Sequence, residues 1–195
     1  MKKSMIAVLA FAAMSSIAFA AEPTVGPASV GVEYDFHKTH NDGTTNHYGA
    51  VGVIKPTAYG TVDLWLQGNR TYAPGLKADN STGWEVGYSQ TIPFEKFTLV
   101  PRVAYGRFNN IEGVGSSKYM LATIEGQMPI NEQVGGFAAY SHTMGLGDAP
   151  SANRVTAGVD VALDKNVALR LGVSHIRQSQ ADSNGVYSVL TYSFN

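Results

Sequence analysis

The sequence of 195 residues predicts an all-β fold, a closed antiparallel up-and-down transmembrane β-barrel of ten strands. Three observations predict it. Turn signals recur with a period of about 36 residues, the segments between them alternate apolar and polar side chains, and only 15% of the residues are charged. Soluble domains carry about 25% charged residues, so this composition favours a surface that mostly faces something other than water.

Residues 1–20 predict a secretory signal peptide that precedes the fold. Lys2 and Lys3 are basic, residues 5–17 are mostly apolar, and small residues at 18 and 20 predict cleavage after Ala20. The apolar stretch is too short for a membrane-spanning helix, and no later stretch has about 18 consecutive apolar residues. We therefore expect an exported protein with one domain, residues 21–195.

The charge balance and the absence of cysteine exclude several classes of function. Removing Lys2 and Lys3 from the 14 basic residues leaves 12 against 15 acidic residues, a net charge of −3. A nucleic-acid partner would require the opposite balance. Because there is no cysteine, the chain has neither disulfides nor thiol chemistry.

Four short turn signals divide the rest of the chain into five hairpin-sized units. They lie at 55–57, 93–96, 129–132 and 164–166, and their markers Pro56, Pro93, Pro129 and Lys165 are separated by 37, 36 and 36 residues. Longer polar or glycine-rich stretches alternate with them, at 39–45, 70–81, 109–116, 145–152 and 178–184. Such alternation is typical of barrels with short turns and both termini in the periplasm and long loops outside.

Ten segments between these connections have the length that a tilted strand needs to cross a bilayer, ~9–11 residues. The alternation is weaker in the second, sixth and seventh, so a barrel of eight strands is the alternative architecture. The predicted strands are 28–38, 46–55, 58–69, 82–92, 97–108, 117–128, 133–143, 153–163, 167–177 and 185–194.

One face of the predicted strands is apolar. In the first strand Val30, Val32, Tyr34 and Phe36 alternate with polar residues, and the later strands repeat the pattern. Aromatic residues tend towards the strand ends, as in the girdles at the two membrane interfaces. These aromatic residues are Tyr34, Phe36, Trp84, Phe97, Phe108, Tyr192 and Phe194.

The opposite face carries charges among small residues. A soluble, lipocalin-like barrel would turn the apolar face inward and cover its outside with Lys and Glu. Here the polar face is mainly Gly, Ala, Ser and Thr, which favours a crowded lumen and an apolar face towards lipid. Nine charged residues are therefore predicted to point inward, namely Glu33, Asp35, Asp63, Glu85, Arg102, Glu125, Arg154, Asp160 and Arg170.

The last predicted strand ends in Leu190, Tyr192 and Phe194, which share one face. With the signal peptide, the hairpin repeat and the alternation, this ending resembles the closing strand of small bacterial outer-membrane β-barrel proteins. The resemblance implies a location in the cell outer membrane of a Gram-negative-type cell, contact with outer-membrane lipid, and recognition of the last strand by the barrel-assembly machinery.

Two functions fit the predicted lumen charges. They line a narrow porin-like channel in which the acidic excess favours cations, or they form a salt-bridged interior that fills a structural barrel. No cofactor is implied. Adhesion through the long loops is a further alternative, and the oligomeric state is open.

Enzymatic and metal-binding functions are weaker alternatives. His142 and His175 follow Ser141 and Ser174, but neighbours in a strand point to opposite faces, so neither adjacent pair forms a catalytic dyad. We therefore expect no catalytic residues and no lipid-modifying activity. The remaining histidines, His37, His40 and His47, surround the first long loop without a diagnostic ligand spacing, so we expect no metal site.

Overall fold

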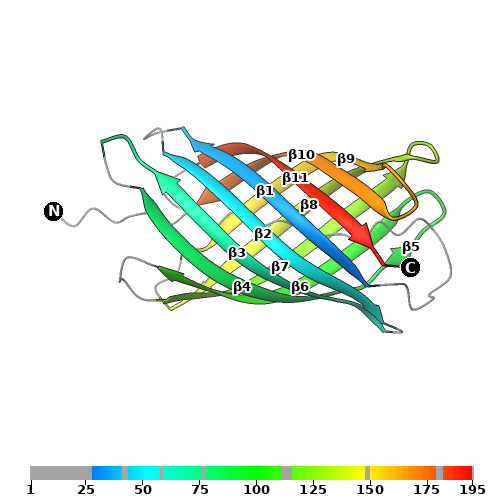
Figure 1. Ribbon diagram of the computed structural model, residues 1–195, viewed down its shortest axis with the longest axis horizontal. Coiled ribbons are helices and arrows are strands. Elements are labelled where there is room, and N and C mark those ends of the chain that lie inside the picture. Colours follow the sequence, from blue (N-terminus) through cyan, green and yellow to red (C-terminus); the bar gives the residue numbers. More distant parts are fainter. Residues whose placement is uncertain are drawn as a thin grey trace.

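The fold is a single antiparallel β-barrel (Figure 1). It is seen in a computed structural model that describes residues 28–40, 44–57, 59–75, 78–110, 116–147, 150–178 and 182–194. The predicted signal peptide and its cleavage site lie outside the described residues. The strands are β1 (Ser29–Thr39), β2 (Thr45–Thr57), β3 (Gly60–Tyr72), β4 (Asp79–Ser89), β5 (Ile92–Pro93), β6 (Thr98–Asn110), β7 (Ser116–Pro129), β8 (Val134–Leu146), β9 (Ala152–Ala162), β10 (Val167–Gln178) and β11 (Asp182–Ser193).

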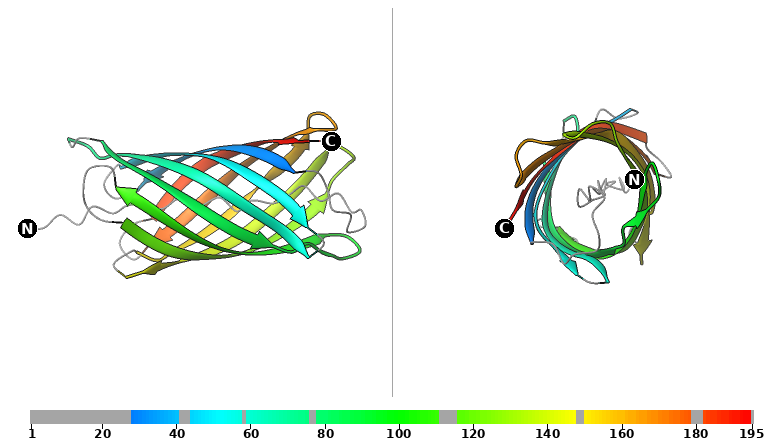
Figure 2. Two further views of the ribbon diagram at one scale, coloured as in Figure 1. Left: turned by 60° about the horizontal axis from the view of Figure 1, so that its bottom comes forward. Right: turned by 90° about the vertical axis from the view of Figure 1, so that its right-hand side faces the viewer.

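Ten long strands close the sheet, as predicted, and the alternative of eight strands is wrong. Each pairs with its neighbour in the chain, and the ring is completed where β1 pairs with β11, from Ser29 opposite Ser193 to Thr39 opposite Ser183. The view along the barrel axis shows this ring (Figure 2, right). The short β5 lies in the connection between β4 and β6 and pairs only with the start of β6. Closure leaves the long strands without an unpaired edge. Each unpaired backbone N–H or C=O group at such an edge would cost several kcal/mol in lipid.

The two ends of the barrel differ less than the sequence suggests. We call the end with Ser29 and Ser193 the terminus end and the opposite one the loop end. At the loop end β3 continues to Tyr72 and β4 begins at Asp79, so six residues connect them, whereas the predicted loop was 70–81. The expected contrast between short turns and long loops is wrong. Polar residues such as Arg70 and Asn80, which lie beyond the apolar part of their strands, still pair with each other between β3 and β4.

Apolar side chains point outward and polar ones inward. Val32, Leu66, Val103 and Val173 are each more than half exposed, whereas all nine predicted lumen charges are buried. The apolar-in arrangement of a soluble barrel is therefore wrong for this chain. Among the described residues, no helix has the length and apolar character needed to cross a membrane.

Glycines on the inner wall make room for large interior rings. The indole of Trp65, which is fully buried, covers Gly31 and Gly52 on the two preceding strands. A Cβ on Gly52 would lie 2.2 Å from Cδ2 of Trp65, and a Cβ on Gly106 would lie 2.1 Å from the Tyr119 ring. Small residues on the polar face thus serve packing inside the barrel.

Gly52→Ala is expected to destabilise the barrel by about 1–3 kcal/mol, because the added methyl group overlaps the Trp65 ring. Urea unfolding of the refolded protein in lipid vesicles, followed by tryptophan fluorescence, measures the effect. Gly126→Ala is the matched control, since a Cβ there meets nothing within 4 Å. Equal stabilities for the two variants would contradict the packing of Trp65 on Gly52.

Candidate functional site: the polar interior of the barrel

The interior charges are arranged around three arginines. Arg102, Arg154 and Arg170 come from β6, β9 and β10, and each contacts at least one buried carboxylate. Alternation on each strand turns these side chains inward, and the register between strands decides which of them meet. The sequence could place all nine charges inside, but the partners emerge only from the structure.

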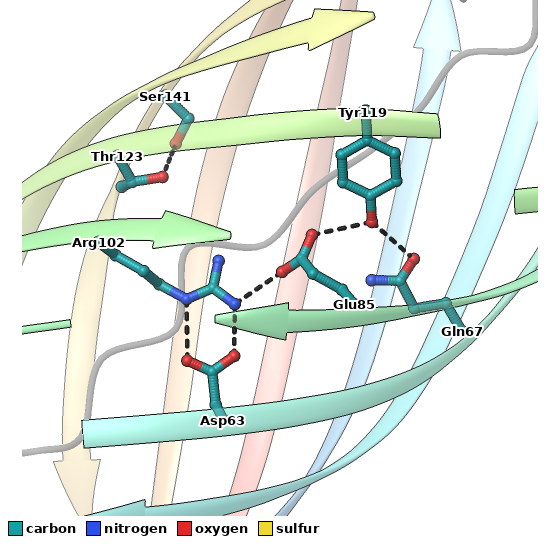
Figure 3. A network of polar contacts seen from close by, with 7 residues as sticks. All are labelled: Asp63, Gln67, Glu85, Arg102, Tyr119, Thr123 and Ser141. Carbon is teal, nitrogen blue, oxygen red and sulfur yellow. Dashed lines mark hydrogen bonds and ion pairs between the residues drawn. The ribbon is translucent and has the colours of Figure 1, made fainter. Parts of the chain in front are cut away.

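Arg102 is the centre of the first cluster (Figure 3). Its Nε donates to Oδ2 of Asp63 at 3.0 Å, and its Nη2 contacts Oδ1 of Asp63 and Oε1 of Glu85, the latter at 2.7 Å. The hydroxyl of Tyr119 lies 2.9 Å from Oε2 of Glu85 and 3.3 Å from Oε1 of Gln67. The cluster spans β3, β4, β6 and β7, so it ties four strands together across their inner face.

Arg170 forms a second cluster with two acids. Its Nη1 and Nη2 donate to Oε2 and Oε1 of Glu125, each at 3.0 Å, in a bidentate pair. Its Nε donates to Oδ1 of Asp160 at 2.6 Å, and the guanidinium lies 4.0 Å from the centre of the Phe137 ring. Bidentate geometry and an aromatic face are the surroundings that favour a buried arginine over lysine.

Arg154 belongs to a third cluster, which contains a histidine that the sequence analysis assigned to the first loop. His37 is fully buried and points into the barrel from β1. Its Nε2 lies 2.8 Å from Oδ1 of Asp35 and 3.3 Å from Oγ of Ser174. Arg154 donates to Oδ2 of Asp35 at 2.9 Å and to Ser174 at 3.3 Å. The signal was available, because His37 has the parity of Asp35 in a predicted strand.

Asp35, His37 and Ser174 have the composition of a catalytic triad but not its geometry. In a triad the acid holds one ring nitrogen of the histidine while the other takes the proton of the serine. Here both Asp35 and Ser174 face Nε2, and Nδ1 has no hydrogen-bond partner in the part of the chain that the structure describes. This arrangement does not activate Ser174 as a nucleophile.

The other histidines lie apart from this cluster. His47 points outward and bonds to the hydroxyl of Tyr34 at 2.7 Å, while His40 lies at the loop end, 3.4 Å from Asn184. His142 and His175 contact Asn153 and Asn184. The five side chains therefore do not converge on one point.

Glu33 is the exception among the interior acids. It is 2% exposed, and neither of its carboxylate oxygens has a hydrogen-bond partner in the part of the chain that the structure describes. Its neighbours across the ladder are Ala50 and Val189, which offer no polar side chain. Each of the other five acids contacts one of the three arginines. Glu33 is thus the acid that the arginines leave unpaired.

Six large aromatic residues lie inside the barrel among the described residues, and the sequence does not predict them as lumen residues. Phe108 was placed among the interfacial aromatics but is buried and stacks on Tyr119, because it has the parity of the inward Arg102. The inward aromatics that the sequence analysis did not single out are Tyr48, Trp65, Tyr119, Phe137 and Tyr187. They narrow the lumen.

Comparison with known proteins gives structural likeness alone. No protein-family model matches the sequence, and no curated protein matches it. An outer-membrane channel from Pseudomonas putida F1 superposes with a TM-score of 0.61 at 10% identity, covering 88% of this chain and 96% of that one. The translocator domain of the autotransporter NalP from Neisseria meningitidis gives 0.55 at 12% identity, covering 88% and 89%.

The transport unit of the autotransporter AIDA-I from Escherichia coli superposes with a TM-score of 0.52 at 11% identity, covering 93% of each chain. At such identities the likeness defines the fold. The chain has the fold of an outer-membrane β-barrel, a closed antiparallel barrel of ten strands that resembles small outer-membrane channels and autotransporter translocator domains.

Proposed function

We propose that this protein is an exported, non-enzymatic barrel of the bacterial outer membrane that forms a narrow channel favouring small cations. The observation that carries the proposal is the inner wall, where six acids face three arginines and Glu33 has no partner among the described residues. Rings of acidic side chains attract cations into a pore. The large interior side chains favour ions or small solutes over bulky ones.

The closing strand supports the proposed location. Leu190, Tyr192 and Phe194 point outward, each 44–48% exposed, and the backbone N–H of Phe194 donates to the carbonyl of Ala28 at 2.9 Å. An outward aromatic at the end of the barrel suits the lipid interface. We propose that these three residues contact outer-membrane lipid and form the signal that the barrel-assembly machinery recognises.

A structural barrel without conductance is the second candidate. It is favoured by the ionic clusters, since Arg102 and Arg170 each join acids from two other strands and so brace the wall. In that case the interior serves stability alone. A measurement of conductance separates the two candidates.

Purified protein in planar lipid bilayers is expected to give discrete, small conductance steps. Under a salt gradient, the reversal potential should have the sign of cation preference, because the interior acids outnumber the arginines. Faster electrophoretic migration of the unheated protein is the control for a closed barrel. If the folded barrel gives no conductance above background, the channel proposal is wrong and the structural barrel is the better candidate.

A further inference from the structure

Two basic residues face each other on the outer surface near the loop end. Arg107 on β6 lies directly opposite Lys118 on β7, and both belong to the outward-facing set of their strands. Side chains in such pairs have Cβ atoms ~4.5–5.5 Å apart, and like charges in this position destabilise the sheet. The two cations are therefore close enough to bind one anion together.

The protein itself supplies no such anion in the described ranges. The other ladder neighbours of the pair are Trp84 on β4 and Leu146 on β8. The next outward pair towards the loop end is Asn109 with Ser116. The buried Nε of Arg107 has no hydrogen-bond partner among the described residues. Two other basic residues at this end have such neighbours, since Arg177 lies opposite Asp182 across the ladder and Arg70 lies 4.9 Å from the Tyr72 ring centre.

The pair stands at the edge of the apolar band. On β7 the outward stripe runs from Met128 through Ile124 and Met120 to Lys118. Ten residues span ~33 Å along a strand, or about 25 Å of height at a tilt of ~40°, which is the height of the lipid-facing band. Trp84 and Tyr105, whose rings are 5.7 Å apart, lie beside and below Arg107 as an interfacial aromatic pair. Lipid headgroups lie at this level.

We propose that Arg107 and Lys118 form a binding site for the phosphate of an anionic lipid headgroup in the leaflet at the loop end. The guanidinium fork of Arg107 suits two phosphate oxygens, and the ammonium of Lys118 adds a second positive charge. Trp84 and Tyr105 contact the same lipid below its headgroup. The apolar surface under the cations selects a lipid over a soluble anion, and the bound phosphate offsets the repulsion between them. The site is independent of conduction through the lumen.

Quenching of tryptophan fluorescence tests the site, because Trp84 lies on the outer surface beside it while Trp65 is inside the barrel. The refolded protein is placed in phosphatidylcholine vesicles that contain bromine-labelled phosphatidylglycerol. Arg107→Gln/Lys118→Gln is expected to lower the preference for the anionic lipid about tenfold or more, at ~1 kcal/mol for each basic residue. Lys55→Gln/Arg177→Gln removes the same charge from outward positions elsewhere and is expected to keep the preference.

Three outcomes overturn the proposal. Equal losses in the two double variants would show a general surface-charge effect, and displacement by millimolar inorganic phosphate would show a soluble-anion site. Self-association of the wild type at this face, abolished by the Arg107/Lys118 variant in phosphatidylcholine alone, would show contact with a second copy. Unchanged electrophoretic mobility of both unheated variants establishes that each barrel is closed.

Discussion

Replacing Arg102 with methionine is expected to lower the free energy of unfolding by about 3–5 kcal/mol. The substitution leaves Asp63 and Glu85, both nearly inaccessible, without the cation that contacts each of them. Two neighbouring carboxylates then repel each other in a medium of low dielectric constant. Urea unfolding in phosphatidylcholine vesicles measures the change.

Two controls separate this cost from general effects of the substitution. Arg177→Met removes an exposed arginine that faces Asp182, and surface pairs of this kind contribute about 0–1 kcal/mol. The triple variant Arg102→Met, Asp63→Asn, Glu85→Gln should recover much of the loss, since no unpaired charge then remains in this cluster. A loss at Arg102 no larger than that at Arg177 would argue against the cluster as a source of stability.

The strands and their faces could be predicted because both follow from local patterns. The turn signals at Pro56, Pro93, Pro129 and Lys165 predict the hairpin period, and parity along each strand then assigns every side chain to one face. In the structure the three prolines lie at strand ends. The nine lumen charges followed from that parity. So did the outward positions of Leu190, Tyr192 and Phe194.

The partners inside the barrel could not be predicted because they depend on register between strands. Arg154 and Asp35 are 119 residues apart and come from β9 and β1, with two strands between them in the sheet. No sequence pattern encodes that approach. The stagger of a closed barrel decides it. For the same reason the sequence could not single out Glu33 among the six acids.

The inward positions of Phe108 and His37 follow from the sequence alone. Phe108 has the parity of Arg102, and His37 has the parity of Asp35, so the alternation that placed the charges inside also places these rings inside. Both residues lie near strand ends. There, the tendency of aromatic residues towards the membrane interface and of histidines towards loops points to a different position from the one that parity predicts. The inward position of His37 matters because it brings the imidazole to Asp35 and Ser174.

Glu33→Gln is expected to lower the cation preference of the channel about fivefold or more without destabilising the barrel. A carboxylate and a cation ~4 Å apart attract by about 1 kcal/mol in water and about 4 kcal/mol near a protein surface. Glu33 is the acid that no arginine contacts among the described residues, so no salt bridge compensates its charge when it is ionised. Reversal potentials in planar bilayers under a salt gradient measure the preference.

Glu85→Gln is the matched control, because it removes the same charge from an acid that Arg102 contacts at 2.7 Å. This variant should lose stability in urea yet change the reversal potential less than Glu33→Gln, since Arg102 and Tyr119 already bond to the carboxylate that it removes. A larger selectivity change at Glu85 would mean that the paired acids control the ions. If the Glu33→Gln variant conducts with wild-type selectivity, Glu33 does not determine the cation preference, whereas the proposal of a channel still stands.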